Sequence, residues 1–163
     1  MRHLIKRFSG LFIIGAILFS FTTPTYQANF SGTWSLNTGK SDLGQFGARL
    51  AATKIVVDQK TDGVTTTKTI NGQNGEITTT ETLPNDGKEV ETALSANAKR
   101  KSTLKWNGDG NTFAVSYTLS FGQGEFSGKE DWSLSADGKL MTVKTTVNFN
   151  GNEVVTSAVY DKQ

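Results

Sequence analysis

Apolar and polar side chains alternate along much of the chain after residue 28. Residues 112–121 carry Phe, Val, Tyr, Leu and Phe at every second position, with Thr, Ala, Ser, Thr and Ser between them. Residues 140–149 repeat the pattern, and Glu130, Trp132 and Leu134 share one face of the segment between the two. Because successive side chains of a strand point to opposite faces, these segments are predicted to be strands with one core face and one solvated face.

Turn residues separate the alternating segments at nearly regular intervals. Asn-Gly and Asp-Gly pairs, which supply the positive φ of tight hairpins, occur at 62–63, 71–72, 74–75, 86–87, 107–108, 109–110, 137–138 and 150–151. The segments between them are rich in Thr, Val, Phe, Tyr and Trp. This spacing predicts an all-β protein of ten strands, over residues 30–36, 53–60, 63–70, 76–83, 88–94, 100–106, 112–121, 128–135, 140–149 and 153–161.

Short links connect nine of these strands, which indicates an antiparallel up-and-down meander. A long meander removes its exposed edges most simply by closing into a barrel. The exception is the first connection, residues 37–52, which predicts one short helical excursion with Ser41 or Asp42 as its cap. The apolar residues at helical spacing there are Leu43, Phe46, Leu50 and Ala51.

Threonine occupies both faces of two predicted strands, at residues 65–67 and 78–80. β-Branching alone accounts for a strand preference. Two functional alternatives stay open: inward threonines would offer hydroxyl groups to a polar ligand, and flat outward ladders would bind an ordered surface.

The first 28 residues have the order of a secretory signal. Arg2, Lys6 and Arg7 precede the apolar run 11–21, and a cleavage zone ends at Ala28. The run is shorter than the about 20 residues that a membrane-spanning helix needs. An uncleaved N-terminal anchor is the alternative, because bulky Tyr26 lies two places before Ala28. We expect residues 1–28 to be a signal peptide and 29–163 to be one domain, secreted or periplasmic, with no transmembrane span in the mature chain.

Charge and composition exclude several function classes for the mature chain. The leader carries three of the 17 Lys and Arg residues, none of the 15 Asp and Glu residues, and the one histidine, His3. The near-neutral remainder lacks the positive field of non-specific nucleic-acid binders, and the basic run 99–101 is interpreted as a solvated strand end. The chain has no cysteine, which excludes disulfides, thiolate nucleophiles and a lipid-carrying cysteine after the signal.

Neither enzyme nor metal chemistry is expected. Without His or Cys, triad catalysis and the preferred zinc ligands are excluded, which leaves carboxylate chemistry. Glu125 and Glu130 are the nearest candidates for it, although Glu130 also fits an inward salt-bridge partner. A calcium site at residues 107–111 is conceivable, but that string lacks the terminal Glu of an EF-hand loop and reads more simply as a hairpin turn. No cofactor and no catalytic residue are predicted, and nothing identifies a protein partner.

Residues 30–36, with the sequence FSGTWSL, resemble the first strand of the calycin barrels: the G-x-W of the lipocalins and the F-x-G-T-W-x-L of the fatty-acid-binding proteins. The continuation N-x-x-K-S-D is most similar to bacterial secreted lipocalin-like proteins. The resemblance to the fatty-acid-binding plan extends over the mature chain and implies a lipocalin-like barrel, with Trp34 as the floor of the cup. A tryptophan there would bury about 200 Å² or more, and a neighbouring glycine would allow a close approach.

The departures from that plan concern the ligand. Fatty-acid-binding proteins carry Arg-x-Tyr in the last strand, where the arginine grips a carboxylate. Here Ala158 stands in the arginine position and Tyr160 is retained, so carboxylate capture by that route is not expected. Arg49 and Arg100 are the arginines after residue 28, and either is a candidate substitute.

Binding of a small hydrophobic or amphipathic molecule in the barrel is therefore the expected function. The candidate ligand contacts are Trp34, Arg100, Phe113, Val115, Tyr117, Leu119, Trp132, Met141, Val143 and Tyr160. The alternative is a structural or interaction barrel whose interior these same side chains fill, acting through its surface in the cell envelope.

Overall fold

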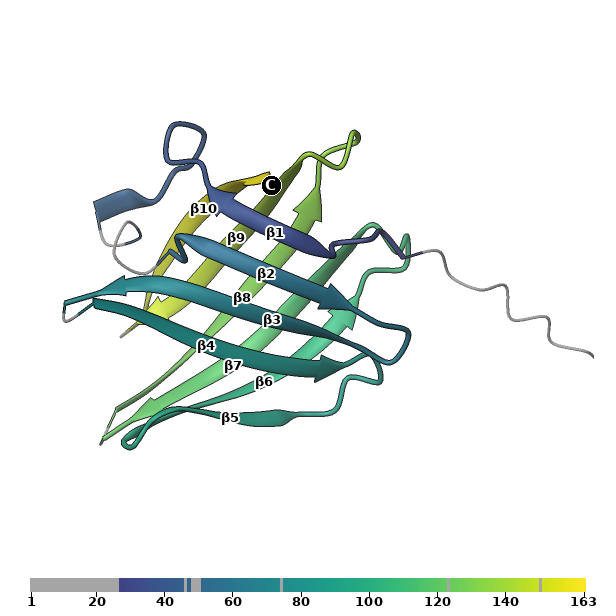
Figure 1. Cartoon of the computed structure of the whole chain (residues 1–163). Coiled ribbons are helices and arrows are strands. Elements are labelled where there is room, and N and C mark those ends of the chain that lie inside the picture. Colours follow the sequence, from purple (N-terminus) through teal and green to yellow (C-terminus); the bar gives the residue numbers. More distant parts are fainter. Residues whose placement is uncertain (1–26, 46, 48–50, 74, 123, 150) are drawn as a thin grey trace, which may run out of the picture.

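The computed structural model describes residues 27–163 except 46, 48–50, 74, 123 and 150 (Figure 1). The described residues form ten strands, at nearly the positions predicted. They are β1 (Gly32–Leu36), β2 (Lys54–Gln59), β3 (Gly63–Gly72), β4 (Gly75–Pro84), β5 (Val90–Ser95), β6 (Ala98–Trp106), β7 (Thr112–Phe121), β8 (Gly124–Leu134), β9 (Leu140–Phe149) and β10 (Asn152–Lys162). The observed hairpins β3–β4, β7–β8 and β9–β10 extend further into their turns than the alternation of apolar residues indicates.

All ten strands belong to one antiparallel sheet with the order β4-β3-β2-β1-β10-β9-β8-β7-β6-β5. The sheet curls so that the chain's first and last strands pair, with Trp34 opposite Lys162 and Leu36 opposite Tyr160 (Figure 1). The prediction of a fully closed barrel is too strong, because the described residues form no ladder between β4 and β5. The contact across this gap is made by side chains of β4 and of β6, the strand next to β5: Arg100 Nε lies 3.6 Å from Glu81 Oε1. With nine ladders and this side-chain contact across the remaining gap, the barrel is nearly closed.

One end of the barrel is sealed by the residues that precede β1. The Ala28 N–H donates to the Gly110 carbonyl in the β6–β7 turn, and the Phe30 N–H donates to Gln59 Oε1 on β2. Phe30 and Trp34 are each 0% exposed, and the Trp34 indole N–H donates to the Phe30 carbonyl at 2.9 Å. The predicted burial of Trp34 is confirmed, and Phe30 is a second component of this closed end.

Gly32 of the G-x-W segment has a local reason to be glycine. Its φ is +143°, a conformation that residues with a Cβ rarely adopt, and a Cβ there would lie 3.1 Å from Lys162 Cε. The expected close approach to Gly32 is therefore present, and the group that approaches is the side chain of Lys162 on β10. Lys162 Nζ lies 5.2 Å from the centre of the Trp34 ring.

The connection from β1 to β2 first follows β10. Asn37 and Asp42 donate their backbone N–H groups to the carbonyls of Val159 and Ser157, each at 2.8 Å. The short helix predicted over residues 37–52 falls partly on 46 and 48–50, outside the described residues, and Arg49 lies there too. The helical excursion is thus not described.

The threonines of β3 and β4 face mainly outward. Thr65, Thr67 and Thr69 pair across the ladder with the hydroxyl groups of Thr82, Thr80 and Thr78 at 2.9–3.3 Å. Thr66 is buried on the opposite, inward face. Since the outward hydroxyls bond to one another, the ladder is explained by pairing between the two strands.

Candidate functional site

The strand register sorts the inward side chains into three tiers along the barrel. The tier nearest the sealed end, here called the floor, is apolar and filled. Phe113 is central to it, stacked on Trp132 at 5.3 Å between ring centres and edge-on to Phe30 at 4.8 Å. The remaining large floor residues are Trp34, Ile55, Val57, Val64, Leu83, Leu104, Val115, Met141, Val143 and Tyr160, each at most 5% exposed. Such packing leaves a ligand no space in this tier.

The second tier is a set of four charged side chains, here called the charged belt: Lys68 on β3, Glu81 on β4, Arg100 on β6 and Glu130 on β8. Lys68 Nζ donates to both carboxylate oxygens of Glu130, at 2.9 and 2.7 Å. Arg100 Nη2 donates to Glu130 Oε1 at 3.0 Å. The Trp132 indole N–H donates to Glu130 Oε2 at 3.1 Å. Four donor contacts therefore satisfy the Glu130 carboxylate, which the low-dielectric interior requires.

The charges of the belt fix the ionisation of its neighbours. Burial by itself raises the pKa of Glu130, but the Lys68 ammonium and the Arg100 guanidinium outweigh it and lower the pKa to about 2. Burial, reinforced by the negative charge of Glu130, raises the pKa of Tyr117 to about 12 and that of Tyr160 well above its usual value. Glu130 is thus a carboxylate and both phenols are neutral at physiological pH.

Glu81 is the least satisfied member of the belt. Its side chain is 10% exposed, and Oε1 has no hydrogen-bond partner among the described residues. The Arg100 Nε at 3.6 Å lies beyond hydrogen-bond distance and donates instead to Ser102 Oγ at 3.0 Å. The belt therefore contains one buried acceptor that has no donor.

Arg100 and Tyr117 pack together across the belt. The guanidinium carbon lies 4.0 Å from the centre of the Tyr117 ring, and Tyr117 lies over Gly128 of β8. A Cβ at Gly128 would overlap the Tyr117 ring and hydroxyl. Gly128 thus provides the room in which Tyr117 lies inside the barrel.

The third tier, here called the mouth, is apolar but open to solvent. The register places Ile77, Phe121 and Val154 on the same inward faces as the floor residues Leu83, Val115 and Ala158. Nevertheless these three mouth residues are 47%, 43% and 44% exposed. Around them lie the half-buried residues Ile70, Leu119, Phe126 and Val147, which also face inward. This end of the barrel therefore presents inward-facing apolar groups that remain exposed to solvent.

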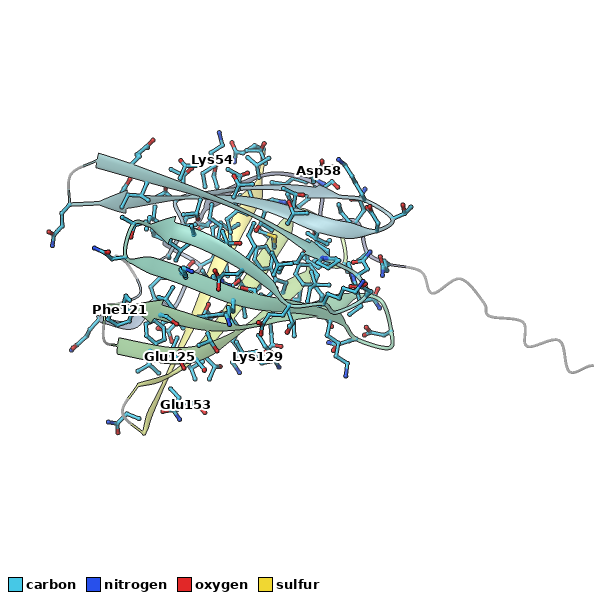
Figure 2. The ribbon with its side chains drawn as sticks, turned by 90° about the horizontal axis from the view of Figure 1, so that it is seen from below. Lys54, Asp58, Phe121, Glu125, Lys129 and Glu153 are labelled. Atoms are coloured by element: carbon cyan, nitrogen blue, oxygen red, sulfur yellow. The ribbon has the colours of Figure 1, made fainter. Side chains whose placement is uncertain are left out.

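Figure 2 shows Phe121 and Glu125 of the β7–β8 hairpin and Glu153 of the β9–β10 hairpin toward one side of the molecule. Lys54 and Asp58 of β2 point away from the interior in the same view. An apolar inner lining therefore lies next to charged outer residues at the mouth.

The structure places the predicted ligand contacts in different tiers. Trp34, Phe113, Val115, Trp132, Met141, Val143 and Tyr160 all face inward but are buried in the floor. Arg100 and Tyr117 lie at the belt, and Leu119 lies in the mouth. The basic run 99–101 is solvated only in part: Lys99 and Lys101 pair outside with Glu91 and Glu89, whereas Arg100 turns inward.

Lys68 and Glu81 were missed by the sequence reasoning. Both share an inward strand face with apolar residues, Lys68 with Val64 and Ile70, and Glu81 with Leu83 and Ile77. A charged side chain at an apolar position of a period-two pattern is the signal that identifies them. Glu125 and Glu130, the carboxylates considered for catalysis, lie on opposite faces of β8 and are not brought together.

Among the described residues, no group of three or more acidic or histidine side chains has the arrangement of a metal site. No helix in this part of the chain has the length and apolar character to cross a membrane. Two surface hollows lie outside the barrel interior, one at Gln27 and Gln59–Asp62 and the other on the outer side of β6–β8 around Lys101 and Ser116.

No protein-family model matches the sequence, and no curated protein matches it. Among solved structures, the zebrafish ileal bile acid-binding protein complexed with cholic acid is similar, with a TM-score of 0.51. The match covers 82% of this chain and 98% of that chain at 17% sequence identity. At this identity the likeness shows the fold alone, and it agrees with the predicted all-β barrel of ten antiparallel strands.

Proposed function

We propose that this protein holds one small amphipathic molecule in the mouth of its barrel, with the apolar body against the mouth residues and the polar end at the charged belt. The observation that carries the proposal is the contrast between two tiers with the same inward orientation. Floor residues are at most 6% exposed, whereas Ile77, Phe121 and Val154 are 43–47% exposed. Covering these mouth residues with an apolar ligand would remove their surface from water, the main driving force for binding in such sites.

The fold supports the same proposal. The zebrafish protein of similar fold is described as a bile acid-binding protein complexed with cholic acid, which is an amphipathic molecule. We propose the same general class of ligand here, in a smaller space, because the floor is filled. The proposed activity is binding without turnover, since the four hydrogen bonds from Lys68, Arg100 and Trp132 leave the Glu130 carboxylate no free position for acid or base chemistry.

Two adjacent valines of β10 test this assignment. Val154 faces the interior and Val155 the outside, and their exposures are nearly equal, 44% and 46%. We expect wild type to bind the neutral fluorescent probe Nile red saturably and with one-to-one stoichiometry. Val154→Asn is expected to weaken binding about fivefold, because a partly exposed valine contributes on the order of 1 kcal/mol when it is covered. Fluorescence titration measures both dissociation constants.

The matched control is Val155→Asn, which makes the same chemical change on the outer face and is expected to leave the dissociation constant unchanged. Equal weakening by both variants would show that the probe adheres outside the barrel. Absence of saturable binding in wild type would instead favour a structural barrel that acts through its surface.

We also propose that the barrel domain works outside the cytoplasm, on the basis of the signal-like order of residues 1–28. Expression of the full chain in a bacterial host is expected to give a periplasmic product that begins near Asn29, measured by mass spectrometry of the intact protein. Full-length protein found in the membrane fraction would contradict cleavage and support the N-terminal anchor.

A further inference from the structure

The buried carboxylate of Glu81 has an unused acceptor that faces the barrel interior. Glu81 lies opposite buried Thr66 in the β3–β4 ladder, and so belongs to the inward face. Its side chain is nine-tenths buried, and Oε1 has no hydrogen-bond partner among the described residues. A buried acceptor without a donor is costly, so a donor supplied from outside the chain would be bound with a gain.

We propose that Glu81 Oε1 accepts a hydrogen bond from a neutral hydroxyl group of the bound molecule, so that the ligand is an alcohol-ended amphiphile and not a carboxylate. This inference rests on the proposed function and specifies the polar end of the same ligand. The apolar body would extend from Glu81 past Thr79 to Ile77, which lies on the same strand face four residues nearer the mouth. Four residues of strand span about 14 Å.

A carboxylate ligand fits the belt poorly. Arg100 and Lys68 are the cations that would receive it, but both already donate to Glu130, and Arg100 Nε also donates to Ser102 Oγ. A ligand carboxylate would have to displace Glu130 while lying beside Glu81, and like charges at short distance in a buried site are unfavourable.

A charged amine fits poorly for the opposite reason. An ammonium group at Glu81 Oε1 would lie near the Arg100 guanidinium, whose Nε is 3.6 Å from that oxygen. Lys68 adds a second positive charge within the belt. Two cations and two carboxylates already balance one another, so a neutral donor is the group that satisfies Glu81 without adding a net charge.

Three of the hairpins at the mouth carry only negative charge at their tips, whereas the fourth, β5–β6, carries Lys99 paired with Glu91. Glu76, Glu125 and Glu153 lie near the tips of β3–β4, β7–β8 and β9–β10, and residues 70–78, 119–127 and 147–155 contain no Lys or Arg. Negative charge at these tips raises the local energy of an approaching anion. Figure 2 shows two of the three carboxylates, Glu125 and Glu153, toward the same side of the molecule. The carboxylates at these three tips therefore add to the selection of the belt against an anion.

Competition for bound Nile red tests the inference with three compounds of equal chain: 1-decanol, its methyl ether 1-methoxydecane, and decanoate, at pH 7.5 and 150 mM salt. We expect decanol to displace the probe at about tenfold lower concentration than the ether, because the ether cannot donate a hydrogen bond to the carboxylate. Decanoate is expected to compete more weakly than decanol by at least the same factor.

Variants of Glu81 assign the preference to this carboxylate. Glu81→Met removes the acceptor at similar volume and is expected to abolish the decanol preference over the ether, with Nile red still bound. Glu81→Gln keeps the shape and a weaker acceptor, and is expected to reduce the preference several-fold. Thr80→Val, on the outer face next to Glu81, is the matched control and is expected to keep the full preference.

The outcomes separate the two levels of the proposal. If Nile red binds in the Val154-dependent manner but decanol and the ether compete equally, the ligand site stands and the hydroxyl subsite at Glu81 is wrong. A decanol preference that persists in Glu81→Met would also overturn the role of Glu81. If Nile red does not bind saturably, the ligand site and the subsite both fail.

Discussion

Replacement of Trp34 by alanine is expected to lower the free energy of unfolding by about 3–5 kcal/mol. The Trp34 side chain is 0% exposed, and its indole N–H donates to the Phe30 carbonyl at 2.9 Å. The substitution would leave a large cavity at the sealed end and would also leave the Phe30 carbonyl without its donor. Urea denaturation followed by tyrosine or residual tryptophan fluorescence and by circular dichroism measures the change.

Two comparisons show where the loss arises. Trp34→Phe keeps an aromatic ring but removes the N–H, and is expected to cost about 1–2 kcal/mol less than the alanine variant, in keeping with a partly filled space. Val56→Ala, on the outer face of the neighbouring strand, is expected to change the free energy of unfolding by at most about 0.5 kcal/mol. A loss below about 1 kcal/mol in Trp34→Ala would contradict the role of Trp34 as part of the floor.

The consequence for ligand binding distinguishes the floor from the mouth. Trp34 was predicted as a ligand contact, yet it lies in the filled tier, where Phe30, Phe113 and Trp132 already occupy the space. Trp34→Phe is therefore expected to affect stability more than the dissociation constant of Nile red. Val154→Asn is expected to affect the dissociation constant of Nile red more than stability, because Val154 is exposed before the probe binds.

Much of the strand layout could be read from local chemistry. The period-two alternation of residues 112–121 and the Asn-Gly and Asp-Gly turns each depend on near neighbours. The structure confirms the alternating segment as β7, and five of the eight predicted turn glycines have positive φ: Gly75, Gly87, Gly110, Gly138 and Gly151. Closure is different, because it depends on residues far apart in the chain. The pairing of β1 with β10 was implied by the barrel plan, whereas the gap between β4 and β5 involves Arg100 and Glu81, whose contact no local pattern indicates.

The candidate site was less predictable for the same reason. Alternation identifies which side chains face inward, and it correctly placed Tyr117 and Leu119 on the same face as Phe113, whereas the inward position of Arg100 was not indicated by its basic run. It does not give the position of a residue along the barrel axis, which the register between distant strands determines. The predicted contacts therefore mixed floor residues with mouth residues, and the partners of Glu130 on β3 and β6 were not identified.

Replacement of Glu130 by glutamine is the second change with a large expected effect, a loss of about 3–5 kcal/mol in the free energy of unfolding. Glu130 accepts from Lys68, Arg100 and Trp132 in the buried belt. Without its charge, Lys68 and Arg100 remain buried with Glu81 as the only opposing carboxylate in the belt. Glu125→Gln, on the exposed outer face of the same strand, is the matched control and is expected to stay within about 0.5 kcal/mol of wild type.

Glu130→Gln is also expected to flatten the acid side of the stability profile. Because the pKa of Glu130 is lowered to about 2 from its ordinary 4.5, its stabilisation is fully present above pH 4.5 and is lost as the pH falls through 2. The difference in unfolding free energy between wild type and Glu130→Gln should therefore shrink by a few kcal/mol over that window. Tyr117, which also faces Glu130, does not titrate there, since its pKa is raised to about 12.

A double variant tests whether Lys68 and Glu130 stabilise the fold as a pair. Lys68→Met together with Glu130→Gln removes one positive and one negative charge and leaves Arg100 facing Glu81, 3.6 Å apart. The double variant is expected to lose clearly less stability than the sum of the two single variants, because each single change leaves an uncompensated buried charge. Strictly additive losses would mean that Lys68 and Glu130 do not depend on one another, in which case the charged belt would not be one coupled unit.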